Sequence, residues 1–168
     1  MLRSRLIAIS SVSALLIGAA LPAAAAPTEV GVSGAWVKAS QYSDHLDGMT
    51  GVFGKLTNKT NRTITLIGGT SNFAKSVDVH QVVNGQMSHK DGGIRIAPGK
   101  SAVLEPGGLH VMLMGLKKKI LPGTKVEIRL NFRGAKSVLL KLTAKAAAAG
   151  DETYAPSPMT SPSSKPTN

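Results

Sequence analysis

The chain has 168 residues and a formal net charge of +11, and it contains no cysteine. The missing cysteine excludes a disulfide-stabilised scaffold, thiol redox chemistry and a blue-copper electron-transfer site, which needs a cysteine thiolate. Aromatic residues make up only 4% of the chain. Platforms for base stacking are therefore scarce and, despite the positive charge, we expect no nucleic-acid partner.

Residues 1–25 have the organisation of a secretory signal. Arg3 and Arg5 form a charged start, an apolar run covers residues 6–21, and Ala23-Ala24-Ala25 meets the small-residue rule for cleavage. The apolar run is short for a helix that crosses a bilayer, which takes about 20 residues. We therefore expect an exported protein, periplasmic or elsewhere in the cell envelope or outside the cell. No cysteine follows the signal, so we do not expect a lipid anchor of the usual bacterial kind.

The rest of the chain reads as one domain, residues 26–149, followed by a tail, residues 150–168. The tail is rich in proline, serine and threonine and cannot bury a core, so we expect it to be disordered. In the domain, short runs of alternating apolar and polar residues between turn residues predict an all-β fold, an antiparallel β-sandwich. The predicted strands are 30–38, 49–57, 63–68, 76–83, 86–89, 94–97, 101–104, 109–114, 125–132 and 137–143.

The stretch 80–114 concentrates three of the four histidines and three of the six methionines. The thioether of methionine is a soft, neutral donor that suits Cu(I), and imidazole suits copper in either oxidation state. A stretch with both donors and no cysteine therefore predicts a soft-metal site.

Within this stretch, Asn84-Gly85 lies between two β-prone runs and predicts a two-residue hairpin loop, because both positions need a positive φ. This loop would place His80 opposite His89 on the neighbouring strand. Since side chains alternate along a strand, one face of the hairpin would carry His80, Val82, Met87 and His89. By the same alternation, one face of the later run would carry His110, Met112 and Met114.

The stretch resembles the periplasmic copper chaperones called PCuAC, whose motif reads H-x10-M-x21-H-x-M and commonly ends as PGG-x-H-x-M-L-M-x-L. This chain has PGGLHVMLMGL at residues 106–116. The flanking segments GAWVKAS, GMTGVFGKLTN and GGIRIAPG also look like that family, and the resemblance covers roughly residues 30–143. It implies a cupredoxin-like Greek-key fold and a Cu(I) site.

Carried over position by position, the resemblance implies that the Cu(I) ligands are His80, Met87, His110 and Met112. The first half of the motif departs from the family pattern. Six residues separate His80 from Met87 where the family has ten, and twenty-two separate Met87 from His110 where it has twenty-one. His89 is therefore an alternative donor to Met87, and Met114 is a weaker one. Binding of Cu(II) through His89 or His45 stays open.

The resemblance implies a copper chaperone that delivers Cu(I) to an extracytoplasmic acceptor, such as the copper centre of a haem–copper oxidase in the membrane or another copper chaperone. We find no Ser/His/Asp or paired-carboxylate constellation, and we expect no enzymatic activity, no small-molecule substrate and a monomeric protein. The alternative is an extracellular β-sandwich interaction module without metal, in which the methionines only pack.

Ordinary structural roles are expected for four other residues. Trp36 is expected to anchor the core, and Met49 to fill it, since methionines on strands are more often packing residues than ligands. His45 is expected in a surface loop, and Met159 in the solvated tail.

Overall fold

Ten β-strands account for the secondary structure of the residues described by this computed structural model, which are 28–41 and 48–146. Within these two ranges no helix is long and apolar enough to cross a membrane. The predicted signal, the tail, His45 and Met159 lie outside the described residues. The strands are β1 (Val30–Lys38), β2 (Met49–Asn58), β3 (Ile64–Ser71), β4 (Ala74–Val83), β5 (Gln86–His89), β6 (Ile94–Ile96), β7 (Ser101–Leu104), β8 (His110–Leu116), β9 (Lys125–Arg133) and β10 (Val138–Lys145).

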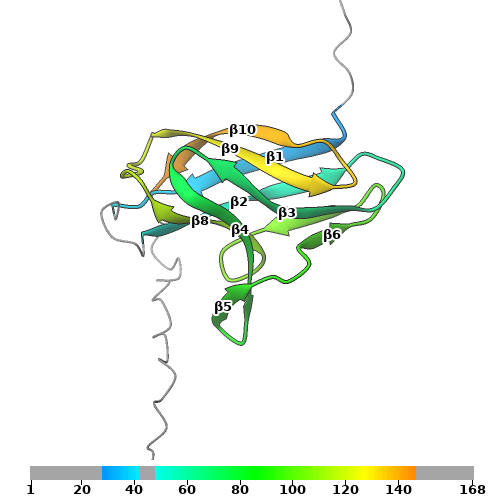
Figure 1. Cartoon of the computed structure of the whole chain (residues 1–168), viewed down its shortest axis with the longest axis horizontal. Helices are drawn as coiled ribbons and strands as arrows, with labels where there is room; N and C mark the ends of the chain where they lie inside the picture. The colour runs from blue at the N-terminus through cyan, green and yellow to red at the C-terminus, as the bar shows by residue number, and fades with distance from the viewer. Residues whose placement is uncertain (1–27, 42–47, 147–168) are drawn as a thin grey trace, which may run out of the picture.

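Seven of the strands form a sheet that curls back on itself. Their order is β4-β8-β2-β1-β10-β9-β3, and β3 meets β4 again through the pairing of Gly69 with Val77. Figure 1 shows the resulting flattened barrel, in which β9 and β10 lie across from β2 and β8. The remaining strands extend it, with β5 on β4, β6 on β3 and β7 on β2. The predicted all-β, sandwich-like fold is confirmed, with one difference: β1 and β10 pair in parallel, Val37 opposite Ala144.

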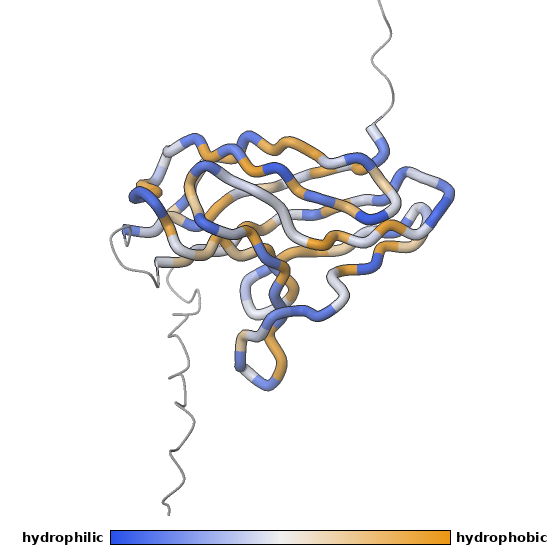
Figure 2. The backbone as a smooth tube through the Cα atoms, viewed as in Figure 1, coloured by the Kyte–Doolittle hydropathy of each residue, from blue (hydrophilic) through white to orange (hydrophobic). Residues whose placement is uncertain are grey.

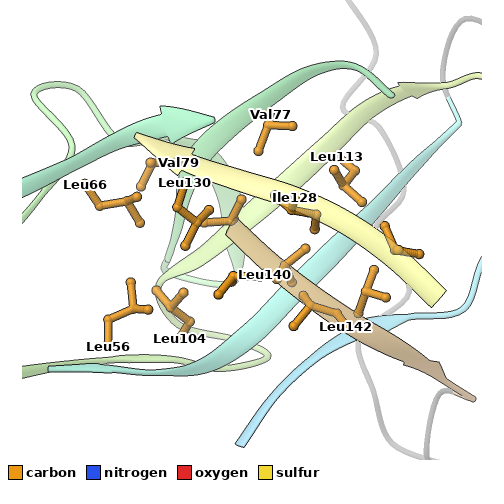
Figure 3. Packing of buried hydrophobic residues seen from close by; sticks show 14 of the residues in the cluster. Leu56, Leu66, Val77, Val79, Leu104, Leu113, Ile128, Leu130, Leu140 and Leu142 are labelled. Atoms are coloured by element: carbon orange, nitrogen blue, oxygen red, sulfur yellow. The ribbon is translucent and has the colours of Figure 1, made fainter. Parts of the chain in front are cut away.

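The core lies inside this curled sheet because the strands alternate as their sequences predict. In β9, every second residue from Val126 to Phe132 is buried, and in β10 Leu140 and Leu142 are buried, as expected. The hydropathy colouring follows the same alternation along the strands (Figure 2). Figure 3 shows side chains from several strands converging in the interior, among them Val77, Val79, Leu113, Ile128 and Leu130.

Trp36 does not anchor this core, so that prediction is wrong. The pairing of β1 with β2 shifts between Ser33 and Trp36, where Gly34 has a φ of +61°. A β-bulge of this kind inserts an extra residue and reverses which side chains face inward. Val37 is consequently buried in the core, whereas the Trp36 ring packs on the outside of the sheet against Phe53, with ring centroids 4.8 Å apart.

Candidate metal centre

The β4–β5 hairpin has the predicted loop and register. Asn84 and Gly85 have φ values of +53° and +73°, as a two-residue loop of this type requires. His80 pairs with His89 and Val82 with Met87, so these four side chains share a face. The hairpin projects from the body of the sheet (Figure 1), and β5 pairs with β4 alone among the described strands.

Strand β8 runs between β4 and β2 and presents two different faces. Val111 and Leu113 point into the core, while His110 and Met112 point to the outer face, away from it. His110 and Met112 are nevertheless 0% exposed. A histidine and a methionine are thus enclosed side by side outside the hydrophobic core.

The strand register places three histidines in one row across the outer face. His80 on β4 pairs with His110 on β8 to one side and with His89 on β5 to the other. The ring centroids of His80 and His110 are 5.9 Å apart, and those of His80 and His89 are 5.7 Å apart. Because metal–nitrogen bonds to imidazole measure about 2 Å, neighbouring rings at this spacing can share one metal ion after small rotations.

The turn before β8 orients His110. Its Nδ1 lies 3.0 Å from the carbonyl oxygen of Gly108, and since a carbonyl only accepts, Nδ1 carries the proton. In the neutral ring, Nε2 then has the lone pair that a metal needs. The same carbonyl accepts a hydrogen bond from the backbone N–H of Val82, so the Pro106-Gly107-Gly108 turn connects the His110 ring to the base of the hairpin.

His80 is half-buried, and one of its ring nitrogens has the properties of a metal ligand. Its Nδ1 is shielded from solvent and has no hydrogen-bond partner among the described residues. Burial lowers the pKa of His80, and the neighbouring His110 and His89 lower it further, whereas Asp78 opposes the shift. Burial also lowers the pKa of His110, against the effect of its bond to Gly108. The lowered pKa values of both imidazoles favour the neutral ring, which is the form that binds metal.

Met112 lies in the next row of the same face. It pairs with Gly51 on β2 and with Asp78 on β4. A methyl group at Gly51 would stand 2.5 Å from the tip of the Phe53 ring, so the Phe53 ring covers Gly51 directly. The centroid of that ring is 6.2 Å from the centroid of His110. The Phe53 ring thus packs beside His110 on the β2 side of the site, and the Trp36 ring packs against Phe53.

The predicted donors divide into three groups by position. His80, His110 and Met112 lie together on β4 and β8. Met87 and His89 lie on the same face but on the projecting hairpin, where Met87 is half-buried and the His89 side chain is 58% exposed beside Asp91. Met114 lies one row beyond Met112, on the side away from His110.

A metal site built from carboxylates and imidazoles alone is not found in the described part of the chain. Across residues 28–41 and 48–146, no three side chains of the His, Asp, Glu or Cys type are grouped closely enough to hold a metal ion. The donor set of this face is mixed, with imidazole from His80 and His110 and thioether from Met112. Sequence reasoning missed Asp78 and Phe53, and only the strand register brings them to the site.

Comparison with known proteins agrees with this architecture. The solved structures that share the fold include the following three. The copper-bound PCuAC domain of PmoF2 is 24% identical, with a TM-score of 0.60 over 73% of this chain and 97% of that domain. The apo PCuAC domain of PmoF1 is 20% identical, with a TM-score of 0.58 over 71% and 95%. The Cu(I) form of DR1885 from Deinococcus radiodurans is 24% identical, with a TM-score of 0.53 over 68% and 78%. The resemblance to PCuAC domains is confirmed at the level of the fold.

Sequence comparison gives the family. A protein of Leifsonia xyli subsp. xyli described as "Putative lipoprotein" is 35% identical over 165 residues, which is 90% of this chain and 96% of that protein. The family model described as "Putative lipoprotein LpqE-like" matches residues 30–144, all but the last residue of the ten-stranded region. The word lipoprotein describes the relative and the family, and the present sequence contains no cysteine. The chain belongs to the LpqE-like family.

Proposed function

We propose that this protein is an exported copper chaperone that binds Cu(I) through His80, His110 and Met112 and passes it to an acceptor outside the cytoplasm. The observation that carries the proposal is the enclosed pair of His110 and Met112 on β8, with His80 directly opposite. Solved proteins of the same fold support it, since two of them are described as copper-bound and Cu(I)-bound.

The donor chemistry favours Cu(I). Neutral imidazoles of His80 and His110 and the neutral sulfur of Met112 add no charge to the site, so the bound ion keeps its positive charge. Soft thioether ligands select Cu(I), and imidazole accepts it as well. Asp78, paired with Met112 and two residues from His80 on the same strand, supplies a nearby negative charge without being a soft ligand.

A fourth donor would come from the β4–β5 hairpin. Met87 provides the sulfur that Cu(I) prefers, and His89 provides the nitrogen that both oxidation states accept. Both donors lie on the face of the hairpin that carries His80, and β5 pairs with β4 alone among the described strands.

The cellular setting is part of the same proposal. The signal-like residues 1–25 and the lipoprotein descriptions of the relative and the family support an exported, cell-envelope protein. In that setting we propose delivery of copper to a membrane acceptor, such as the copper centre of a haem–copper oxidase, or to another copper chaperone. The role is transport, with no chemical change to a substrate.

Two measurements test the proposal. In an anaerobic titration against a chromophoric Cu(I) chelator, the mature protein is expected to hold one Cu(I) tightly per chain. Folded protein that cannot compete for Cu(I) would contradict the proposal and favour the metal-free interaction module.

Delivery is then tested by mixing the loaded protein with the copper-free soluble domain of an oxidase copper subunit. Spectroscopic appearance of the acceptor's copper centre is expected, and retention of copper by the chaperone would contradict delivery to this acceptor.

A further inference from the structure

Two more methionines lie on the outer face next to Met112. Met49, the first residue of β2, pairs directly with Met114 on β8. Met114 and Met112 are two residues apart on one strand, so their side chains project from the same face. The register therefore sets three thioethers in sequence, from Met112 to Met114 and across to Met49.

Neither Met49 nor Met114 packs in the hydrophobic core. Both are half-buried, and neither belongs to the interior cluster nor to the side chains packed against it. The prediction that Met49 fills the core is wrong, because β2 turns Val52 and Leu56 inward and Met49 faces the other way. Methionine is among the residue types most often fully buried, so a partly exposed pair outside the core calls for another role.

Met112 is more deeply enclosed than the other two methionines. Met49 and Met114 are partly open to solvent, whereas Met112 and His110 are fully enclosed. An ion that moves along β8 towards His110 would thus leave the accessible sulfur atoms of Met49 and Met114 and bind the enclosed sulfur atom of Met112. Directly opposite residues on paired antiparallel strands have Cβ atoms about 5 Å apart, a spacing at which two flexible methionine side chains can hold one ion between their sulfur atoms.

We propose that Met49 and Met114 form a second, outer Cu(I) site through which copper enters or leaves the enclosed site. This inference rests on the proposed function. Transfer proceeds by ligand exchange: as the bond from copper to the Met49 sulfur breaks, a bond to the Met112 sulfur forms, while Met114 stays bound throughout. In the next exchange His110 replaces Met114. Copper remains Cu(I), and no proton or electron is transferred.

Methionine methyl groups provide a direct readout of the outer site. The mature protein, labelled with ¹³C at the methionine methyl groups, is titrated with Cu(I) under anaerobic conditions and followed by NMR, with signals assigned from single methionine-to-leucine variants. We expect the Met112 signal to shift with the first equivalent, and the Met49 and Met114 signals to shift with a second, weaker one. If the Met112 signal shifts and those of Met49 and Met114 stay unchanged, the outer site is refuted and the proposed function stands. If no methionine signal shifts, the proposed function fails as well.

Transfer kinetics test the route. Met49→Leu/Met114→Leu keeps side-chain volume and removes both sulfur atoms, and such swaps are usually well tolerated. Release of Cu(I) from this variant to a chelator is expected to slow roughly tenfold. Met159→Leu, outside the family-matched residues 30–144, serves as the matched control and should release copper at the wild-type rate. Equal rates in all three proteins would overturn the route.

Discussion

His80 and His110 lie directly opposite each other on β4 and β8, with ring centroids 5.9 Å apart. Two connections fix this relationship. The ladder between the strands sets the two residues in register, and the carbonyl of Gly108 accepts hydrogen bonds from both the His110 ring and the backbone of Val82 on the His80 strand. The two imidazoles are thereby held close together before any metal arrives, which reduces the ordering cost of binding.

The hairpin residues should contribute differently to the two oxidation states of copper. Met87→Leu is expected to weaken Cu(I) binding by about tenfold and to leave Cu(II) binding nearly unchanged, because thioether sulfur favours Cu(I). His89→Ala should weaken Cu(II) binding more than Cu(I) binding. Chelator competition measures the first affinity and tryptophan fluorescence quenching the second. A larger Cu(I) loss in His89→Ala than in Met87→Leu would identify His89 as the fourth Cu(I) donor instead.

The metal-free protein should lose stability in mild acid. Burial lowers the pKa of His80 and His110 below the ordinary value of 6.5, so below that pH the unfolded chain takes up protons more readily than the folded one. The stabilisation is fully present above about pH 6.5 and is lost as the pH falls through the folded-state pKa values. Urea unfolding at about pH 7.5 and about pH 5.5, with a chelator present, measures this difference.

His80→Gln is the control for this pH effect. Its free energy of unfolding should depend less on pH over the same interval, because one of the two histidines with a lowered pKa has been removed. Stability that rises as the wild-type protein is acidified would contradict the account.

Much of the fold was predictable because its determinants are local. The Asn84-Gly85 loop requires a positive φ at both positions, and this alone fixes the register that pairs His80 with His89. Alternation within β8 likewise predicted that His110 and Met112 share one face. All ten strands occur where the alternating patterns predict them, with bounds that differ by a few residues at most.

Features that depend on contacts distant in sequence could not be predicted. The bulge at Gly34 reverses the alternation of β1 and moves Trp36 to the outer face, and nothing in the pattern of β1 itself reveals that reversal. The parallel pairing of β1 with β10 joins the two ends of the domain. The positions of Asp78, Phe53 and Met49 beside the site follow from which strands neighbour β8. Alternation within a single strand does not determine that order.

Gly51 should be required for packing beside Met112. A methyl group there would press on the Phe53 ring at 2.5 Å, so Gly51→Ala is expected to reduce the free energy of unfolding by about 1–3 kcal/mol, as overpacking does. Gly31→Ala is the matched control in β1, because the one close approach of its methyl group, at 2.8 Å, would be to the flexible end of Lys59. Urea unfolding compares the two variants. Equal stability would show that the Phe53 ring moves aside without cost.

The central claim is that His110 and Met112 hold Cu(I), and paired variants in an anaerobic chelator competition test it most directly. His110→Ala/Met112→Leu, shown to be folded by circular dichroism, is expected to lose Cu(I) affinity by roughly a hundredfold or more, which is about 2.7 kcal/mol or more of binding free energy. His45→Ala/Met159→Leu removes the same two residue types outside the described part of the chain and should bind Cu(I) as the wild type does. Wild-type affinity in the folded His110→Ala/Met112→Leu variant would contradict the account.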